Sequence, residues 1–150
     1  MTESFVELIE KRGASVTSKW RGFFAGWVII LVGVLIAHFV QTSSGVIIKD
    51  VRFEGTGGKT LSALLYLPDQ ATAQNKAPAI LAVHGYINSR EVQSGFAIEF
   101  ARRGYVVLAL DQTGHGYSAP PAFGDGFGGP AALQYLRSLD MVDPDNVGLE

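Results

Sequence analysis

Cysteine is absent from the 150-residue sequence, and no block of like charge occurs in it. Without cysteine the chain has no disulfide, no thiolate metal site and no cysteine nucleophile. Twelve Lys and Arg residues stand against 14 Asp and Glu residues, in short mixed groups. This near-neutral balance lacks the basic surface typical of nucleic-acid-binding proteins, so we expect no nucleic-acid partner. The length allows one modest domain.

Residues 23–40, "FFAGWVIILVGVLIAHFV", carry no formal charge. As a helix this stretch is about 27 Å long at 1.5 Å per residue, close to the roughly 30 Å of a hydrocarbon core. It therefore predicts one uncleaved transmembrane helix, with the lipid bilayer as a partner. A cleaved signal peptide is the alternative, because four basic residues precede the stretch. Against it, signal-peptide cores run to about 15 residues and end at a small-x-small site, whereas this stretch is longer and exits through "AHFVQTSSG", which holds no A-x-A pattern. The four basic residues are Lys11, Arg12, Lys19 and Arg21.

Basic residues are unevenly distributed around this segment, since the first one after it is Lys49. The positive-inside rule then predicts a single-pass protein with a cytoplasmic N-terminus and an extracytoplasmic soluble domain. We accordingly divide the chain into a short N-terminal segment (1–22), the transmembrane helix (23–40), a polar hinge (41–45) and the soluble domain (46–150).

The soluble domain begins with a pattern of strands. Residues 46–53 alternate and are rich in β-branched residues, and residues 60–67 follow a glycine-rich turn, which together predict an antiparallel hairpin. Continuous apolar runs at 79–83 and 105–110 are typical of strands buried on both faces of a parallel sheet. A third such strand begins at "NVGLE", residues 146–150.

Helical patterns separate the buried strands. The first helix begins at Asn88 or Ser89 and ends at the C-cap Gly104, and Val92, Phe96 and Phe100 recur on one face of it. A second helix opens at a proline. It begins at Pro130, and one face of it is made by Ala132, Leu133, Leu136 and Leu139. The alternation of strand and helix predicts an α/β fold with helices on both faces of the sheet.

Ligands of such sheets bind at the carboxyl ends of the strands. "HGYINS" follows the first buried strand, where Gly85 allows a sharp turn that leaves backbone N–H groups facing the sheet end. Such N–H groups stabilise a developing oxyanion. A plain strand-to-helix turn is the alternative for the same residues.

"DQTGHGYS" follows the second buried strand. Gly114, Gly116 and Ala119 fit the dinucleotide pattern G-x-G-x-x-A. That pattern requires a helix whose N-terminus holds the pyrophosphate, whereas Pro120 and Pro121 follow at once and no helix opens. We therefore expect no nucleotide cofactor at this turn.

A metal site built from His84, His115 and Asp111 is a further alternative for these two stretches. We do not favour it, because both histidines lie in turns of a recognisable kind. We expect neither a metal nor a cofactor.

"AILAVHGYINSRE", "VVLALDQTGHGYS" and "DPDNVGLE", in this order, resemble the first half of the α/β-hydrolase superfamily. The resemblance is closest to serine hydrolases of the dienelactone hydrolase and acyl-peptidase kind, and it covers residues 46–150. It implies a mostly parallel α/β-hydrolase sheet. In that family the strand resembling "NVGLE" leads into the nucleophile elbow G-x-S-x-G, and the triad order is Ser, Asp or Glu, then His. The sequence holds no G-x-S-x-G, since "GYSAP" has Pro120 at the second glycine.

The resemblance therefore implies that the fold is cut before the nucleophile elbow and that no triad residue lies in this chain. Carried over residue by residue, it makes the backbone N–H of Tyr86 one half of the oxyanion hole. His84 and Gly85 shape that turn. The resemblance gives Asp111, His115 and Ser118 a turn-stabilising role.

We expect the N-terminal fragment of a membrane-anchored serine hydrolase that acts on ester or amide bonds of a small-molecule ester or peptide. As an isolated 150-residue chain it should be inactive and poorly stable. The alternative is a non-catalytic, membrane-tethered binding module with an α/β-hydrolase-like fold, and a nucleotide-binding α/β protein is the third hypothesis. Whether the protein is an enzyme stays open among these.

Overall fold

A computed structural model describes residues 5–42, 45–121 and 123–150. The chain divides into two compact units, residues 1–41 and 42–150, which are taken separately below.

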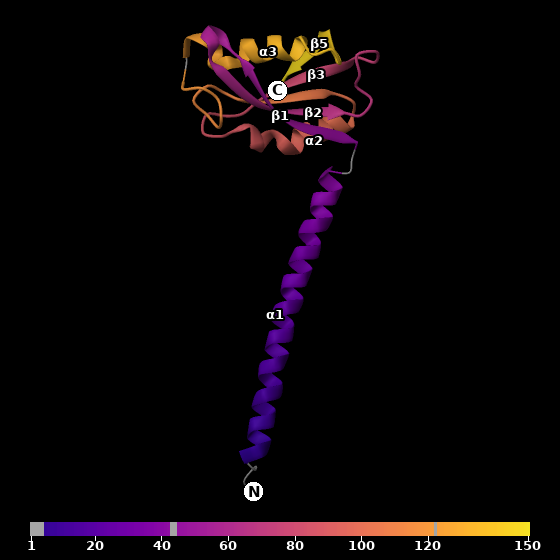
Figure 1. Cartoon of the computed structure of the whole chain (residues 1–150), viewed down its shortest axis with the longest axis vertical. Coiled ribbons are helices and arrows are strands. Elements are labelled where there is room, and N and C mark those ends of the chain that lie inside the picture. The colour runs from indigo at the N-terminus through magenta and orange to yellow at the C-terminus, as the bar shows by residue number, and fades with distance from the viewer. Residues whose placement is uncertain (1–4, 43–44, 122) are drawn as a thin grey trace. The chain divides into compact units, whose positions relative to one another are not determined.

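The first unit is one long helix, α1 (Phe5–Thr42), shown in Figure 1. Its segment Trp20–Val40 has a mean hydropathy of 2.5, and none of it is buried. By length and composition this segment fits a membrane span, and a signal sequence near an N-terminus has the same properties. The helix runs two residues into the predicted hinge, because Gln41 and Thr42 are helical, while Ser43 and Ser44 lie outside the described residues. No proline or glycine interrupts the sequence between Val40 and Gly45.

The second unit is built on a five-stranded mixed sheet with the order β1-β2-β4-β3-β5. β1 and β2 form the predicted antiparallel hairpin, β2 pairs antiparallel with β4, and β3 lies parallel between β4 and β5. The strands are β1 (Val46–Glu54), β2 (Thr60–Pro68), β3 (Ala77–Val83), β4 (Val106–Asp111) and β5 (Val142–Leu149). The α/β fold predicted from the sequence is confirmed, but the sheet is mixed rather than mostly parallel, because two of its four strand pairings are antiparallel.

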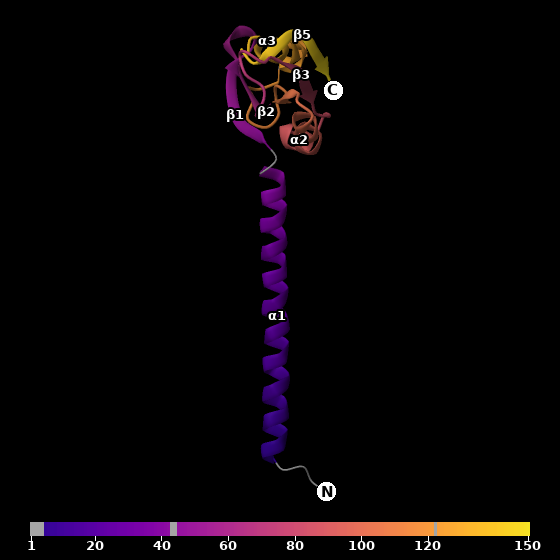
Figure 2. The ribbon, with the colours of Figure 1, turned by 90° about the vertical axis from the view of Figure 1, so that its right-hand side faces the viewer.

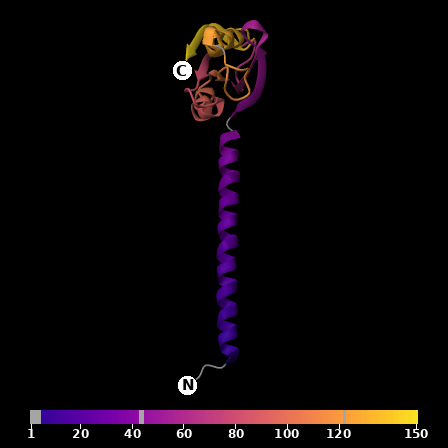
Figure 3. The same ribbon diagram turned by 90° about the vertical axis from the view of Figure 1, so that its left-hand side faces the viewer.

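One helix covers each face of the sheet. α2 (Ser94–Arg102) and α3 (Gly129–Arg137) lie on opposite sides, as Figures 1, 2 and 3 show from three directions. α3 packs Ala132 and Leu136 into one apolar cluster with the sheet, and both residues are fully buried as the sequence predicted. Every residue of β4 is buried, because both of its faces are covered.

Helix α2 presents a different face to the sheet from the one predicted. Ala97 and Ala101 are buried against it and the predicted Phe100 is partly buried beside them, whereas Val92 and Phe96 are 51% and 60% exposed. The residues before α2 form a 3-10 turn (Arg90–Gln93), so the α-helix begins only at Ser94. A 3-10 turn has about three residues per turn, and the spacing of four that linked Val92 to Phe96 therefore does not hold across it.

Strand β5 begins at Val142, four residues earlier than predicted, and contains Pro144. It is an edge strand, paired with β3 alone among the described residues, and its register shifts between Ala77 and Ala79 of β3. Proline is compatible with an edge strand because its missing N–H does not have to serve a second neighbour.

Candidate active site

The turns after β3 and β4 lie side by side, because these strands are parallel neighbours whose ends are in register at Val83 and Leu110. We refer to residues His84–Ser89 as the β3 turn and to Gln112–Ser118 as the β4 turn. They contain the two stretches that the sequence singled out. The site is built from contacts between them.

His84 is buried and joins the two turns. Its Nδ1 lies 2.8 Å from the carbonyl oxygen of Gly85, and its Nε2 accepts a hydrogen bond from the backbone N–H of Gln112 at 3.2 Å. The side-chain amide of Gln112 donates in return to the carbonyl of His84 at 2.6 Å. Because Nε2 accepts, the neutral ring carries its proton on Nδ1 and donates it to Gly85.

Tyr86 carries the N–H group predicted to form half of an oxyanion hole. The carbonyl at the other end of its peptide bond, that of Gly85, accepts hydrogen bonds from His84 and from the N–H of Asn88 at 3.1 Å. A trans peptide is planar, so its N–H points away from its C=O. Among the residues that the structure describes, nothing accepts a hydrogen bond from the Tyr86 N–H. The Tyr86 N–H is therefore an unpaired backbone donor, and among the described residues the N–H groups of Gly85, Ile87 and Ser89 in this turn likewise have no acceptor.

Gly85 contributes its carbonyl to this turn and needs no conformation reserved for glycine. A Cβ added to Gly85 would meet only the side-chain nitrogen of Asn88, at 3.6 Å, and its φ lies outside the left-handed region. The backbone conformation of Gly85 and the space around it therefore do not support the inference that a glycine is needed for a sharp turn at this position.

The β4 turn is folded around the carboxylate of Asp111, which is fully buried. One oxygen accepts a hydrogen bond from the N–H of Arg90 at 2.9 Å, and the other accepts from the N–H of Tyr117 at 3.0 Å. The hydroxyl of Ser118 donates to the carbonyl of Asp111 and accepts from the N–H of Ser62 at 2.9 Å. These contacts match the turn-stabilising role that the resemblance implied for Asp111 and Ser118.

A buried guanidinium group supports the same network. Arg90 donates to both carboxylate oxygens of Asp50, at 3.0 and 2.9 Å, and to the hydroxyl of Ser62 at 2.8 Å. Its Nε lies 3.5 Å from the buried carboxylate of Asp111. The hydrogen bonds from Arg90, assisted by Arg52, lower the pKa of Asp50 to about 2 against the opposing effect of desolvation. The arrangement ties β1, β2 and the β4 turn together.

Sequence reasoning missed Arg90, Asp50 and Ser62. Arg90 was seen only as part of the helix start "INSRE", and no local pattern in the sequence links it to Asp50, 40 residues earlier, or to Ser62, 28 residues earlier. The one available signal was a charged residue directly after a turn that follows a buried strand.

His115 contacts the β3 turn from the β4 turn. Its Nε2 donates to the carbonyl oxygen of Tyr86, and its Nδ1 lies 3.3 Å from the carbonyl oxygen of Thr113. The rings of His84 and His115 meet edge to face, with their centroids 5.0 Å apart. The ring nitrogens of both histidines are directed at backbone groups rather than at a common point.

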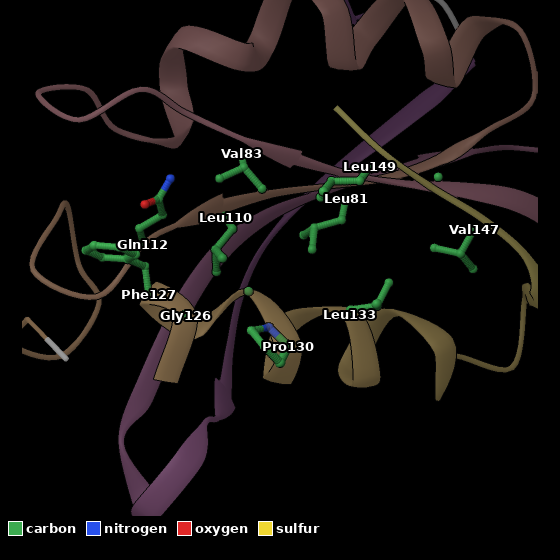
Figure 4. A pocket seen from close by; sticks show the side chains of 12 residues that line it. Leu81, Val83, Leu110, Gln112, Gly126, Phe127, Pro130, Leu133, Val147 and Leu149 are labelled. Carbon is green, nitrogen blue, oxygen red and sulfur yellow. The ribbon is translucent and has the colours of Figure 1, made fainter. Parts of the chain in front are cut away.

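Two cavities adjoin these turns. The larger, about 500 Å³, is apolar and lies between α3 and the ends of β3 and β5, as Figure 4 shows. The smaller, about 290 Å³, is bordered by both turns and by the segment before α3. Phe127 borders both cavities, and among the described residues it is the one non-glycine with a positive φ, 58°.

Comparison with known proteins shows what this architecture resembles. Residues 74–140 match the family described as serine aminopeptidase, S33. The quorum-quenching protein AidA of Acinetobacter baumannii (strain MDR-ZJ06) is 34% identical over 113 residues, which cover 65% of this chain and 33% of that protein.

Solved structures with a similar fold include two that cover most of this chain. A hypothetical protein from Pseudomonas aeruginosa superposes with a TM-score of 0.62 at 28% identity, covering 70% of this chain and 35% of that one. A bacterial heroin esterase superposes with a TM-score of 0.60 at 23% identity, covering 83% of this chain and 40% of that one. The chain thus spans about a third of the length of AidA and of the Pseudomonas aeruginosa protein. The resemblance to the α/β-hydrolase superfamily predicted from the sequence is thus confirmed.

Proposed function

We propose that this α/β-hydrolase-like chain is the N-terminal part of a membrane-anchored serine hydrolase that cleaves ester or amide bonds. The observation that carries the proposal is the oriented backbone N–H of Tyr86 at the carboxyl end of β3, which has no acceptor among the described residues. An unpaired donor at this position is suited to an oxygen atom that bears developing negative charge.

The position of β5 supports the second half of the site. The N–H of Glu150 donates to the carbonyl of Leu81 at 3.0 Å, and its carbonyl accepts from the N–H of Val83 at 3.1 Å. Glu150 is therefore held beside the last residue of β3, three positions before Tyr86. A nucleophile carried a few residues after β5 would emerge at the same edge of the sheet as the Tyr86 N–H.

The reaction then follows the order of the superfamily. A serine after β5 attacks the substrate carbonyl, a histidine further along takes its proton, and the carbonyl oxygen becomes the oxyanion of a tetrahedral intermediate. The Tyr86 N–H donates to that oxyanion, and the residue after the nucleophile supplies the second donor. In this proposal the 150-residue chain supplies one of the two donors and no triad member, so alone it is inactive.

Backbone substitution tests the role of Tyr86 in the complete protein. Tyr86→Pro removes the N–H and should lower kcat for a p-nitrophenyl ester by about 10²- to 10³-fold. Tyr86→Ala keeps the N–H and is the matched control, with kcat close to that of the wild type. Equal kcat values for the two variants would show that this N–H does not stabilise the transition state.

Fluorophosphonate labelling tests the division of the site. The complete protein should be labelled on a serine after β5, and the 150-residue chain should not be labelled. A complete protein that neither reacts with the probe nor hydrolyses esters would favour the non-catalytic binding module. Labelling of the 150-residue chain would place the nucleophile within it and contradict the proposal.

The apolar segment Trp20–Val40 supports the membrane anchor. The bias of Lys and Arg toward its N-terminal side supports a cytoplasmic N-terminus. An anchored protein should remain in the membrane fraction after alkaline carbonate extraction and keep its N-terminal residues by mass spectrometry. A mature N-terminus beyond residue 40 would show that the segment is a cleaved signal sequence instead.

A further inference from the structure

We propose that His115 is a positioning residue of the oxyanion site, and that it orients Tyr86 by holding its carbonyl group. This role rests on the proposed function. The proposal comes from the hydrogen bond that Nε2 of His115 donates to the Tyr86 carbonyl, across 29 positions of sequence and between two turns.

The direction of the Tyr86 N–H depends on two peptide planes that meet at its α-carbon. The first plane joins Gly85 to Tyr86 and is held by the hydrogen bonds from His84 and Asn88 to the carbonyl of Gly85. The second plane joins Tyr86 to Ile87, and the contact from His115 holds its carbonyl. Because each peptide is planar, fixing both planes fixes both backbone dihedrals of Tyr86.

The contact from His115 matters because the side chains of Tyr86 and Ile87 do little to hold the tip of the β3 turn in place. Tyr86 and Ile87 are 78% and 88% exposed, so their side chains bury little surface that would keep the backbone in one conformation. The peptide plane that joins Tyr86 to Ile87 is held instead by the hydrogen bond from the His115 ring.

The backbone of His115 is itself held by hydrogen bonds within the β4 turn. Its N–H donates to the carbonyl of Gln112 at 3.0 Å, and its carbonyl accepts from the N–H of Ser118 at 3.1 Å. The β4 turn around it is anchored on the buried carboxylate of Asp111. Because the His115 ring is fixed relative to the buried strand β4, its hydrogen bond restrains the exposed β3 turn relative to that strand.

The geometry separates this role from acid–base catalysis. Both ring nitrogens of His115 face backbone carbonyls, of Tyr86 and of Thr113. A neutral imidazole has one N–H, and here Nε2 carries it, because Nε2 is closer to the Tyr86 carbonyl than Nδ1 is to the Thr113 carbonyl. The ring acts on the substrate only through the Tyr86 backbone.

Two variants of His115 in the complete protein test the proposal. His115→Phe keeps a flat ring and loses the donor, while His115→Gln restores an amide N–H at a similar distance from the backbone. We expect His115→Phe to lower kcat per titrated active site by about 10- to 100-fold, with KM changed by less than about threefold. Its affinity for an alkylboronic acid, which mimics the tetrahedral intermediate, should fall by a similar factor. His115→Gln should recover most of both losses.

Tyr117→Phe is the matched control in the same turn, because it keeps the ring that packs under Arg90 and Arg52. It should behave as the wild type. Counting active sites by burst titration separates orientation from folding: a variant that merely unfolds loses titratable sites and keeps kcat per site.

The outcomes distinguish this role from the proposed function. An active wild type whose His115→Phe variant keeps the wild-type kcat per site, or whose Gln variant is no better than the Phe variant, would overturn the positioning role alone. A complete wild-type protein without hydrolytic activity would overturn the proposed function, and the positioning role with it.

Discussion

The carboxylate of Asp111 occupies the space in which a side chain on Gly116 would begin. A Cβ placed on Gly116 would lie 2.2 Å from Oδ2 of Asp111 and 2.3 Å from its carboxyl carbon. The carboxylate cannot move aside without loss, because it accepts hydrogen bonds from the N–H groups of Arg90 and Tyr117. The second glycine of "GHG" is therefore required by a contact with the end of β4, in addition to its φ of +49°.

Gly116→Ala should consequently destabilise the soluble unit by about 2–4 kcal/mol, the sum of overpacking and of a left-handed backbone at a non-glycine residue. The measurement is urea unfolding of the detergent-solubilised protein. Gly124→Ala is the matched control, since a Cβ at Gly124 meets nothing within 4 Å and its φ is not in the left-handed region. It should change the free energy of unfolding by less than about 0.5 kcal/mol. Similar losses for the two variants would contradict this account.

Arg90→Met should cost about 3–5 kcal/mol of unfolding free energy, because it leaves the buried carboxylate of Asp111 without its nearby positive charge. Methionine keeps much of the side-chain volume, so the loss reports the charge more than a cavity. Arg103→Gln removes an exposed arginine paired with Glu99 on the surface of α2, and should cost less than about 1 kcal/mol. Equal free energies of unfolding for the Arg90 and Arg103 variants would contradict a stabilising role for Arg90.

Asp50 predicts how stability responds to acid. Its pKa is lowered from 3.8 to about 2, first by the hydrogen bond from Arg90. In this range the unfolded chain binds more protons than the folded one, so the contribution of Asp50 is complete above about pH 4 and is lost as pH falls through about 2. The carboxylate is half exposed, so solvent screening keeps the effect below about 1 kcal/mol. The unfolding free energies of the wild type and Asp50→Asn, measured from pH 5 to pH 2, should therefore converge with acid. Parallel curves would contradict the lowered pKa.

The orientation of α2 predicts opposite responses at two adjacent residues. Phe96 is exposed, so Phe96→Gln should change the free energy of unfolding by less than about 0.5 kcal/mol. Ala97 is fully buried against the sheet, so Ala97→Leu should cost about 1–3 kcal/mol through overpacking. Thermal unfolding of both variants checks the helix phase. A larger loss of stability for Phe96→Gln than for Ala97→Leu would indicate that Phe96 faces the sheet, as the sequence predicted.

Elements whose signals are local were predicted well. The hairpin of β1 and β2, the buried strands β3 and β4 and the apolar face of α3 depend on residue periodicity and on turn residues close by in the chain. The start of β5 and the phase of α2 were predicted wrongly for a common reason. Each depends on how an irregular stretch, a register shift in one case and a 3-10 turn in the other, fits against the sheet.

The sequence by itself determined the order of strands and helices, the apolar segment near the N-terminus and the two turns at which a site would form, because periodicity and turn chemistry are written in neighbouring residues. Only the tertiary structure decided which residues of those turns contact each other and the neighbouring strands. It brought Arg90 to Asp50 and His115 to the Tyr86 carbonyl, contacts that span 40 and 29 positions. Such pairings depend on which strands are neighbours in the sheet and on how far each turn reaches, and no local pattern of residues specifies either.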